Sequence, residues 1–154
     1  MKMKNFNWKR LTSLSSIFLA LGVVLEAIGL IAYAVKGVDE FNDALSLPVL
    51  ILAISALALS LFLYASKAFF SDSSVVNPIF EVGVYSGYLL ALMGFLYYIV
   101  SQVNYLANVF VAIDGTTISF PFILTAGSFL LAFVFMLLSG ILGKKDADKQ
   151  GEKL

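Results

Sequence analysis

The chain of 154 residues contains no cysteine and no histidine. The first absence excludes disulfides and thiol nucleophiles, and the second removes the commonest general base and metal ligand. Only 13% of the residues are charged and the net charge is zero, so there is no basic face to neutralise nucleic-acid phosphates. No acid pair lies at catalytic spacing either. We therefore expect no enzymatic activity, no metal or cofactor site and no nucleic-acid binding.

Long apolar stretches dominate what the chain does contain. Hydrophobic residues make up 60% of it and the mean hydropathy is +0.95, which is more apolar surface than a soluble fold of this size could bury. A helix of about 20 residues spans the hydrocarbon core of a bilayer, and four stretches reach that length. The sequence predicts an all-α integral membrane protein, one domain over 1–154, with four transmembrane helices in an up-down bundle. The predicted spans are 11–35, 47–70, 79–100 and 119–142.

Basic residues are divided unequally between the two sides of such a bundle. If both termini share one side, that side carries nine Lys or Arg residues and the other carries only Lys36. Cytoplasmic loops hold the excess of basic residues, so we expect cytoplasmic tails (1–10 and 143–154) and a multi-pass protein of the cell membrane. A cleaved signal peptide is the competing interpretation of the N-terminus, because its apolar run reaches Ala32-Tyr33-Ala34.

The segment between the third and fourth spans has an alternating apolar pattern around Asp114-Gly115. This pattern is the strongest short-range signal for a β-hairpin, and a two-residue turn would place the alternating side chains on one face. An isolated hairpin is marginal in water. We therefore expect an extracytoplasmic hairpin over 108–120 that is either a lid on the bundle or a partner-facing surface; the alternative is an extension of the third helix. The surface residues would be Val109, Val111, Ile113, Asp114, Gly115, Ile118 and Phe120.

Small residues recur at four-residue spacing along the spans. In membranes such residues allow two helices to approach closely, so they predict helix-packing seams. The seams serve packing within one bundle and also permit self-association. The candidate packing residues are Gly22, Gly29, Gly83, Gly87, Ala91, Ser128 and Ala132.

Glu26 interrupts the apolar pattern near the middle of the first span. No basic residue lies in the interior of any span, so we expect Glu26 to be protonated unless water or a cation reaches it. Helical spacing places Glu26 on one face with Gly22, Gly29 and Tyr33, directed into the bundle. Two roles are open: a proton or cation carrier, or a neutral hydrogen bond or partner contact. The hydroxyl groups considered as partners are those of Ser55, Ser60, Tyr64, Ser86 and Tyr88.

The segment Leu25–Gly29 resembles the first-span glutamate region of the small multidrug resistance exporters. In that family the glutamate alternately binds protons and cationic substrates within an antiparallel dimer, and the resemblance implies such a role for Glu26. The chain departs from the family in its greater length, in its long outer segment and in a charge bias that opposes dual insertion.

Two functions follow from these features. The favoured one is a non-enzymatic accessory or structural subunit of a larger membrane assembly, with the lipid bilayer and another membrane protein or a second copy as partners. The alternative is a small proton- or cation-coupled transporter or channel that uses Glu26. It would act as a homo-oligomer, because four short helices enclose little space.

Overall fold

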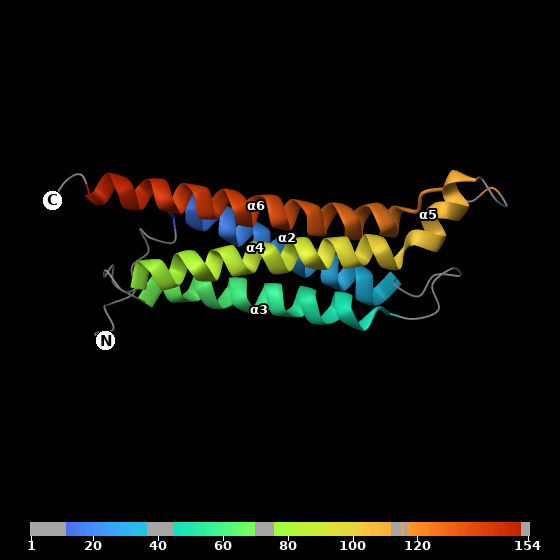
Figure 1. Cartoon of the computed structure of the whole chain (residues 1–154), viewed down its shortest axis with the longest axis horizontal. Coiled ribbons are helices and arrows are strands. Elements are labelled where there is room, and N and C mark those ends of the chain that lie inside the picture. The colour runs from blue at the N-terminus through green and yellow to red at the C-terminus, as the bar shows by residue number, and fades with distance from the viewer. Residues whose placement is uncertain (1–11, 37–44, 70–75, 112–114, 116, 152–154) are drawn as a thin grey trace.

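The computed structural model describes residues 12–36, 45–69, 76–111, 115 and 117–151 (Figure 1). Its helices are α2 (Leu14–Lys36), α3 (Leu47–Phe69), α4 (Val76–Ser101), α5 (Val103–Phe110) and α6 (Phe120–Gly151). Four of them contain stretches long and apolar enough to cross a membrane, namely Leu14–Val35, Leu47–Ser66, Phe80–Ser101 and Phe120–Gly143. The predicted set of four apolar, membrane-length helices is therefore confirmed in the described part of the chain.

The three prolines lie where they do not interrupt these helices. Pro48, Pro78 and Pro121 each fall in the first turn of a helix, where a missing backbone N–H leaves no hydrogen bond unmade. The helices begin and end within a few residues of the predicted spans, except that α6 continues beyond residue 142 to Gly151. Helix α6 thus extends past the apolar stretch into the charged sequence that follows it.

Helix α2 packs against α6 in the antiparallel direction. Gly22 faces Ala132 and Met136, whereas Gly29, farther along α2, faces Ser128 and Phe129, which come earlier in α6. Helices α3 and α4 are paired in the same sense. Gly83 faces Leu63, Gly87 faces Ser60 and Gly94 faces Ala53, so residue numbers rise along α4 as they fall along α3.

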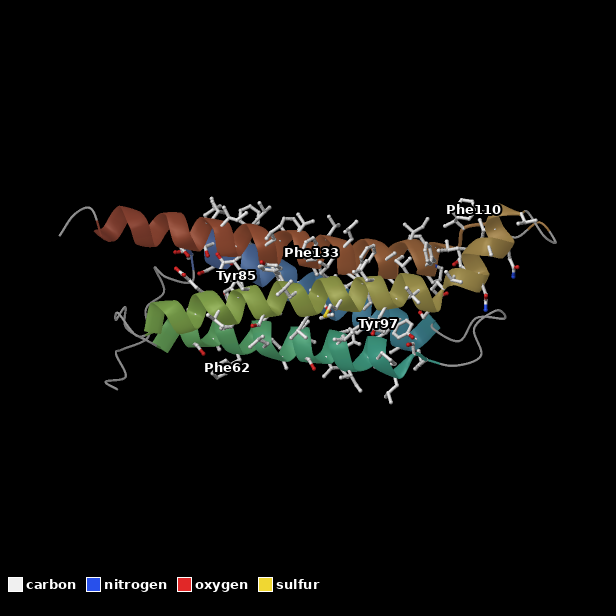
Figure 2. The ribbon with its side chains drawn as sticks, viewed as in Figure 1. Phe62, Tyr85, Tyr97, Phe110 and Phe133 are labelled. Carbon is white, nitrogen blue, oxygen red and sulfur yellow. The ribbon has the colours of Figure 1, made fainter. Side chains whose placement is uncertain are left out.

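Two clusters of buried apolar side chains form the core. The first core cluster contains Leu19, Ala56, Leu63, Val84, Ala91 and Met136. The second core cluster contains Tyr33, Val49, Ala53, Tyr98 and Phe129, and it lies toward the end of the bundle that carries α5. On the outside, large apolar side chains such as Ile31, Phe62 and Ile123 are exposed, and Phe62 projects from α3 in Figure 2. An apolar exterior of this kind suits lipid rather than water.

The β-hairpin predicted over 108–120 is not supported. Residues 108–110 form the end of α5, Phe120 begins α6, and the described residues between them include no strand. Within the candidate surface, Val109 is half-buried in α5, whereas Val111, Gly115, Ile118 and Phe120 are exposed. Ile113 and Asp114 lie outside the described residues. Gly115 has φ of 71°, in the left-handed region that glycine adopts without strain, so a special backbone conformation does occur next to Asp114.

Helix α5 differs from both predicted alternatives: it follows α4 directly, but it is a separate helix that begins after Gln102. The backbone N–H of Gln102 donates to the carbonyls of Tyr98 and Ile99, both at 3.1 Å, so the chain stays coiled where α4 ends. A helix satisfies its own backbone hydrogen bonds, whereas a lone two-stranded hairpin has no third strand or helix to stabilise it.

Candidate functional site

The Glu26 side chain is the only buried acidic group among the described residues. It lies on the inner face of α2 and its exposed fraction is 0%. Neither carboxyl oxygen, Oε1 or Oε2, has a hydrogen-bond partner in the part of the chain that the structure describes. A buried polar group normally has such a partner, so its absence is a reason to look for a function.

Glycines on either side of Glu26 hold α6 close to α2. A methyl group at Gly22 would lie 2.8 Å from Met136 Cγ and 3.3 Å from the Ala132 carbonyl oxygen. A methyl group at Gly29 would lie 2.7 Å from the ring of Phe129. Glu26 lies between these two close contacts along α2 and is fully buried.

Glu26 also lies at the junction of the two core clusters. It follows Leu19 of the first core cluster by seven residues and precedes Tyr33 of the second by seven. Seven residues are nearly two helical turns, so the carboxyl lies about 10 Å along the helix from each of them. Apolar side chains therefore close the site toward both ends of the bundle.

Alanines occupy the middle of the buried faces of the other three long helices. Ala132 lies between Phe129, which meets Gly29, and Met136, which meets Gly22, and Ala91 lies between Gly87 and Gly94, which face α3. Ala56 holds the matching place in α3, and all three alanines are fully buried. Alanine leaves space for a longer neighbouring side chain and offers no hydrogen bond to it.

None of the hydroxyl groups considered as partners is bonded to Glu26, and those of Ser60 and Ser86 donate to other atoms. The Tyr33 hydroxyl accepts a hydrogen bond of 2.6 Å from the Ser46 backbone N–H, and Ser60 Oγ donates to Met136 Sδ at 3.5 Å. Ser86 Oγ donates to the Val82 carbonyl at 2.9 Å, and Tyr64 packs beside the first core cluster. Candidate site residues Tyr33, Ser60 and Tyr64 are thus near the core but are not bonded to Glu26.

The candidate packing residues lie at the helix interfaces. Gly22, Gly29, Ser128 and Ala132 bring α2 and α6 together. On α4, Gly83 meets the Leu63 side chain, Gly87 meets Ser60 Oγ, and Ala91 belongs to the first core cluster. These positions account for packing within one bundle.

A polar contact that the sequence did not indicate joins the beginning of α2 to the later part of α6. Ser15 Oγ donates to the Ser139 carbonyl at 2.9 Å, and Ser139 Oγ donates to the Ser15 carbonyl at 2.7 Å. Both residues are buried. A serine within an apolar stretch indicates that its hydroxyl needs a hydrogen-bond partner. The sequence does not show which serines pair, because that depends on the register of α2 against α6.

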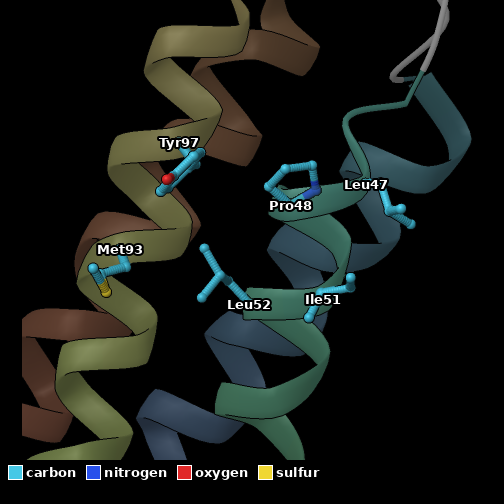
Figure 3. A pocket seen from close by; sticks show the side chains of 6 residues that line it. All are labelled: Leu47, Pro48, Ile51, Leu52, Met93 and Tyr97. Carbon is cyan, nitrogen blue, oxygen red and sulfur yellow. The ribbon is translucent and has the colours of Figure 1, made fainter.

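A shallow groove lies between α3 and α4 near the α5 end (Figure 3). Its volume is about 370 Å³, and its lining residues are Leu47, Pro48, Ile51, Leu52, Met93 and Tyr97. No acidic or basic side chain lines it, so the groove adds no ionisable group to the site. Among the residues searched, no three His, Cys, Asp or Glu side chains gather as a metal site would require.

No protein-family model matches the chain, and no curated protein or solved structure matches it. The likeness of Leu25–Gly29 to the small multidrug resistance exporters thus gains no support from a wider match. The surroundings of Glu26 are therefore the main indication of function in this chain.

Proposed function

We propose that this chain is a non-enzymatic multi-pass membrane protein that acts as a small proton- or cation-coupled transporter through Glu26. The observation that supports the proposal is the complete burial of a carboxyl group with no hydrogen-bond partner in the described residues. A register-fixing role would need a bonded carboxyl oxygen, and a contact to a partner subunit would need an exposed side chain. Neither condition is met, which leaves the exchange of a proton or cation as the better account.

The transport cycle would require the α2–α6 interface to open. The two core clusters close the carboxyl toward both ends of the bundle, so a proton or cation reaches it only when helices separate. Alternating access supplies such motion by moving helices around a fixed central site. Because four short helices enclose little space, the transporter would act as a homo-oligomer.

The same proposal includes an orientation. Helices α2 and α6 are joined at Ser15 and Ser139, so the beginning of the first span and the end of the last share one side. Nine of the ten basic residues belong to that side if the bundle is up-down across the bilayer. The positive-inside rule then gives cytoplasmic termini, and the proposal takes the membrane to be the cell membrane.

The test compares wild-type protein with Glu26→Gln in liposomes that contain the pH-sensitive dye pyranine. An imposed gradient of Na⁺, K⁺ or tetraphenylphosphonium should drive proton movement through the wild type and reduce the pH gradient. Glutamine keeps the shape of the side chain but cannot release a proton. We therefore expect protons to move in liposomes with this variant no faster than in protein-free liposomes. Ion-driven proton movement that is unchanged in Glu26→Gln would contradict the proposal.

Glu81→Gln is the matched control. Glu81 is exposed in the first turns of α4, and the substitution makes the same chemical change away from the α2–α6 interface. Its flux should equal that of the wild type. A wild-type protein that moves no protons with any of the three ions would also count against transport.

An accessory or structural subunit is the second candidate function. It is favoured by the small amount of chain outside the long helices: the described connections consist of α5 and short irregular stretches. Such a subunit would act through another membrane protein. Extraction in mild detergent followed by mass spectrometry should then show a larger membrane protein in stoichiometric amount, whereas a partner-free oligomer would favour the transporter.

A further inference from the structure

The connection between α4 and α6 is almost free of charge. From Val82 to Gly143 the chain has one charged residue, Asp114. The end of α2 and the start of α3 lie at the same end of the bundle, and the sequence that joins them contains Asp39, Glu40 and Asp43. These two connecting sequences thus differ sharply in composition, and only the one between α2 and α3 has the composition expected of a segment surrounded by water.

Apolar side chains are exposed on this connection. We call residues 102–111 and 117–120 the α5 cap. Phe110 is 84% exposed, and Val103, Val111, Ile118 and Phe120 are also exposed. These side chains continue the apolar exterior of α4 and α6, where Val100 and Ile123 are exposed. The lipid-facing surface of the bundle and the apolar surface of the cap are therefore adjacent along the chain.

The cap has a defined position relative to the bundle. Figure 1 shows α5 turned steeply away from the long axis of α4. Tyr105 ties it to the start of α6: its hydroxyl donates to the Thr117 carbonyl at 3.0 Å and accepts from the Ser119 N–H at 2.6 Å. The Tyr105 ring packs on that of Phe122, with 5.6 Å between centroids. A helix turned from the bundle axis at the end of a span runs toward the plane of the bilayer surface.

We propose that the α5 cap lies in the headgroup region of the bilayer, with Phe110 and its exposed apolar neighbours inserted among neutral phospholipids. An amphipathic helix binds this region through buried apolar area, and basic residues add attraction to anionic lipids. The cap contains no Lys or Arg, so its attachment depends on apolar area alone. Its polar residues Gln102, Asn104 and Asn108 are uncharged; Asn104 is exposed, and Gln102 and Asn108 are half-buried. Attachment should therefore be insensitive to lipid charge and to salt.

The experiment places a tryptophan at Phe110 in the full-length protein, after Trp8→Phe has removed the natural one. The protein is reconstituted in phosphatidylcholine nanodiscs that contain no other protein. The Phe110→Trp variant should show blue-shifted emission, quenching by brominated lipid, and several-fold weaker quenching by aqueous iodide than a tryptophan in water. Replacing half of the lipid with phosphatidylglycerol should change none of these values.

Asn104→Trp is the matched control on the same helix. Asn104 is exposed and polar, so iodide should quench a tryptophan there strongly. Val111→Trp provides a second apolar position if Phe110→Trp reduces expression. Equal iodide quenching at Phe110 and Asn104 in nanodiscs would overturn the proposal. Protection of Phe110 in native membranes that is lost in nanodiscs would also overturn it, because a protein partner would then cover the cap.

Discussion

At the scale of single residues, burial removes water from the Glu26 carboxyl and the described residues give it no hydrogen bond in return. An unsatisfied buried polar group costs about 1–3 kcal/mol. We therefore expect Glu26→Met, which keeps the length of the side chain and removes its polar atoms, to raise the free energy of unfolding by about that amount. Denaturant unfolding of the purified protein in mild detergent measures this change.

The Glu26→Gln variant is the control for this stability measurement. Its amide is as unsatisfied as the carboxyl, so its free energy of unfolding should stay near that of the wild type. A Met variant that is less stable than the wild type would show that a water or an ion bonds the carboxyl. A stabilised but inactive Met variant would identify Glu26 as a group retained for function at the expense of stability.

Ser139 provides the opposite case, a polar side chain whose hydrogen bonds are made. Its hydroxyl donates to the Ser15 carbonyl at 2.7 Å, and its own carbonyl accepts from Ser15 Oγ. Hydrogen bonds between membrane helices contribute about 0.6 kcal/mol on average. Ser139→Ala should therefore lower the free energy of unfolding by roughly that amount in the same assay, and a stabilised variant would contradict the contact.

At the scale of the helices, the approach of α2 to α6 depends on Gly29. A methyl group there would lie 2.7 and 2.8 Å from two atoms of the Phe129 ring and 3.3 Å from Ser128 Cβ. A ring cannot bend aside as an aliphatic chain can, so the helices must separate. Overpacking of this kind costs about 1–3 kcal/mol, and Gly29→Ala should lower the free energy of unfolding accordingly.

Gly127→Ala is the matched substitution in α6, at a position away from this interface. A methyl group at Gly127 meets no atom within 4 Å among the described residues. Because alanine is the better helix former, this variant should be as stable as the wild type or more stable. Equal losses in the two variants would mean that glycine flexibility, rather than close approach, matters at both positions.

The helices were predictable from the sequence because composition and length alone identify a membrane span. The spacing of Gly22, Glu26 and Gly29 also indicated correctly that the carboxyl faces the bundle. The connection to α6 was not predictable in the same way. Asp114-Gly115 favours a turn locally, but the residues before it form α5, and the Tyr105 hydroxyl joins that helix to Thr117 and Ser119. That contact joins distant residues and has no local signature.

The absence of a partner for Glu26 was likewise beyond sequence reasoning. Several hydroxyls share the interior, and the register between helices decides which of them meet. Ser60 Oγ donates to Met136 Sδ, the Tyr33 hydroxyl accepts from the Ser46 N–H, and neither group is bonded to the carboxyl. Each of these pairings joins two different helices or a helix and its connection, and helical periodicity within one span carries no information about it.

At the scale of the whole molecule, alternating access requires each end of the α2–α6 interface to open in turn, so locking one end should stop transport. Ser15 and Ser139 have hydroxyl oxygens 3.4 Å apart, and the natural chain has no cysteine to form competing disulfides. In the double variant Ser15→Cys/Ser139→Cys, the sulfurs need only a small shift to reach a bond of about 2.05 Å. We expect oxidation to abolish ion-driven proton flux in liposomes and a reductant to restore it, while each single variant stays active under both conditions. Full flux through protein shown by mass spectrometry to be cross-linked would exclude opening at this end as a step of the cycle.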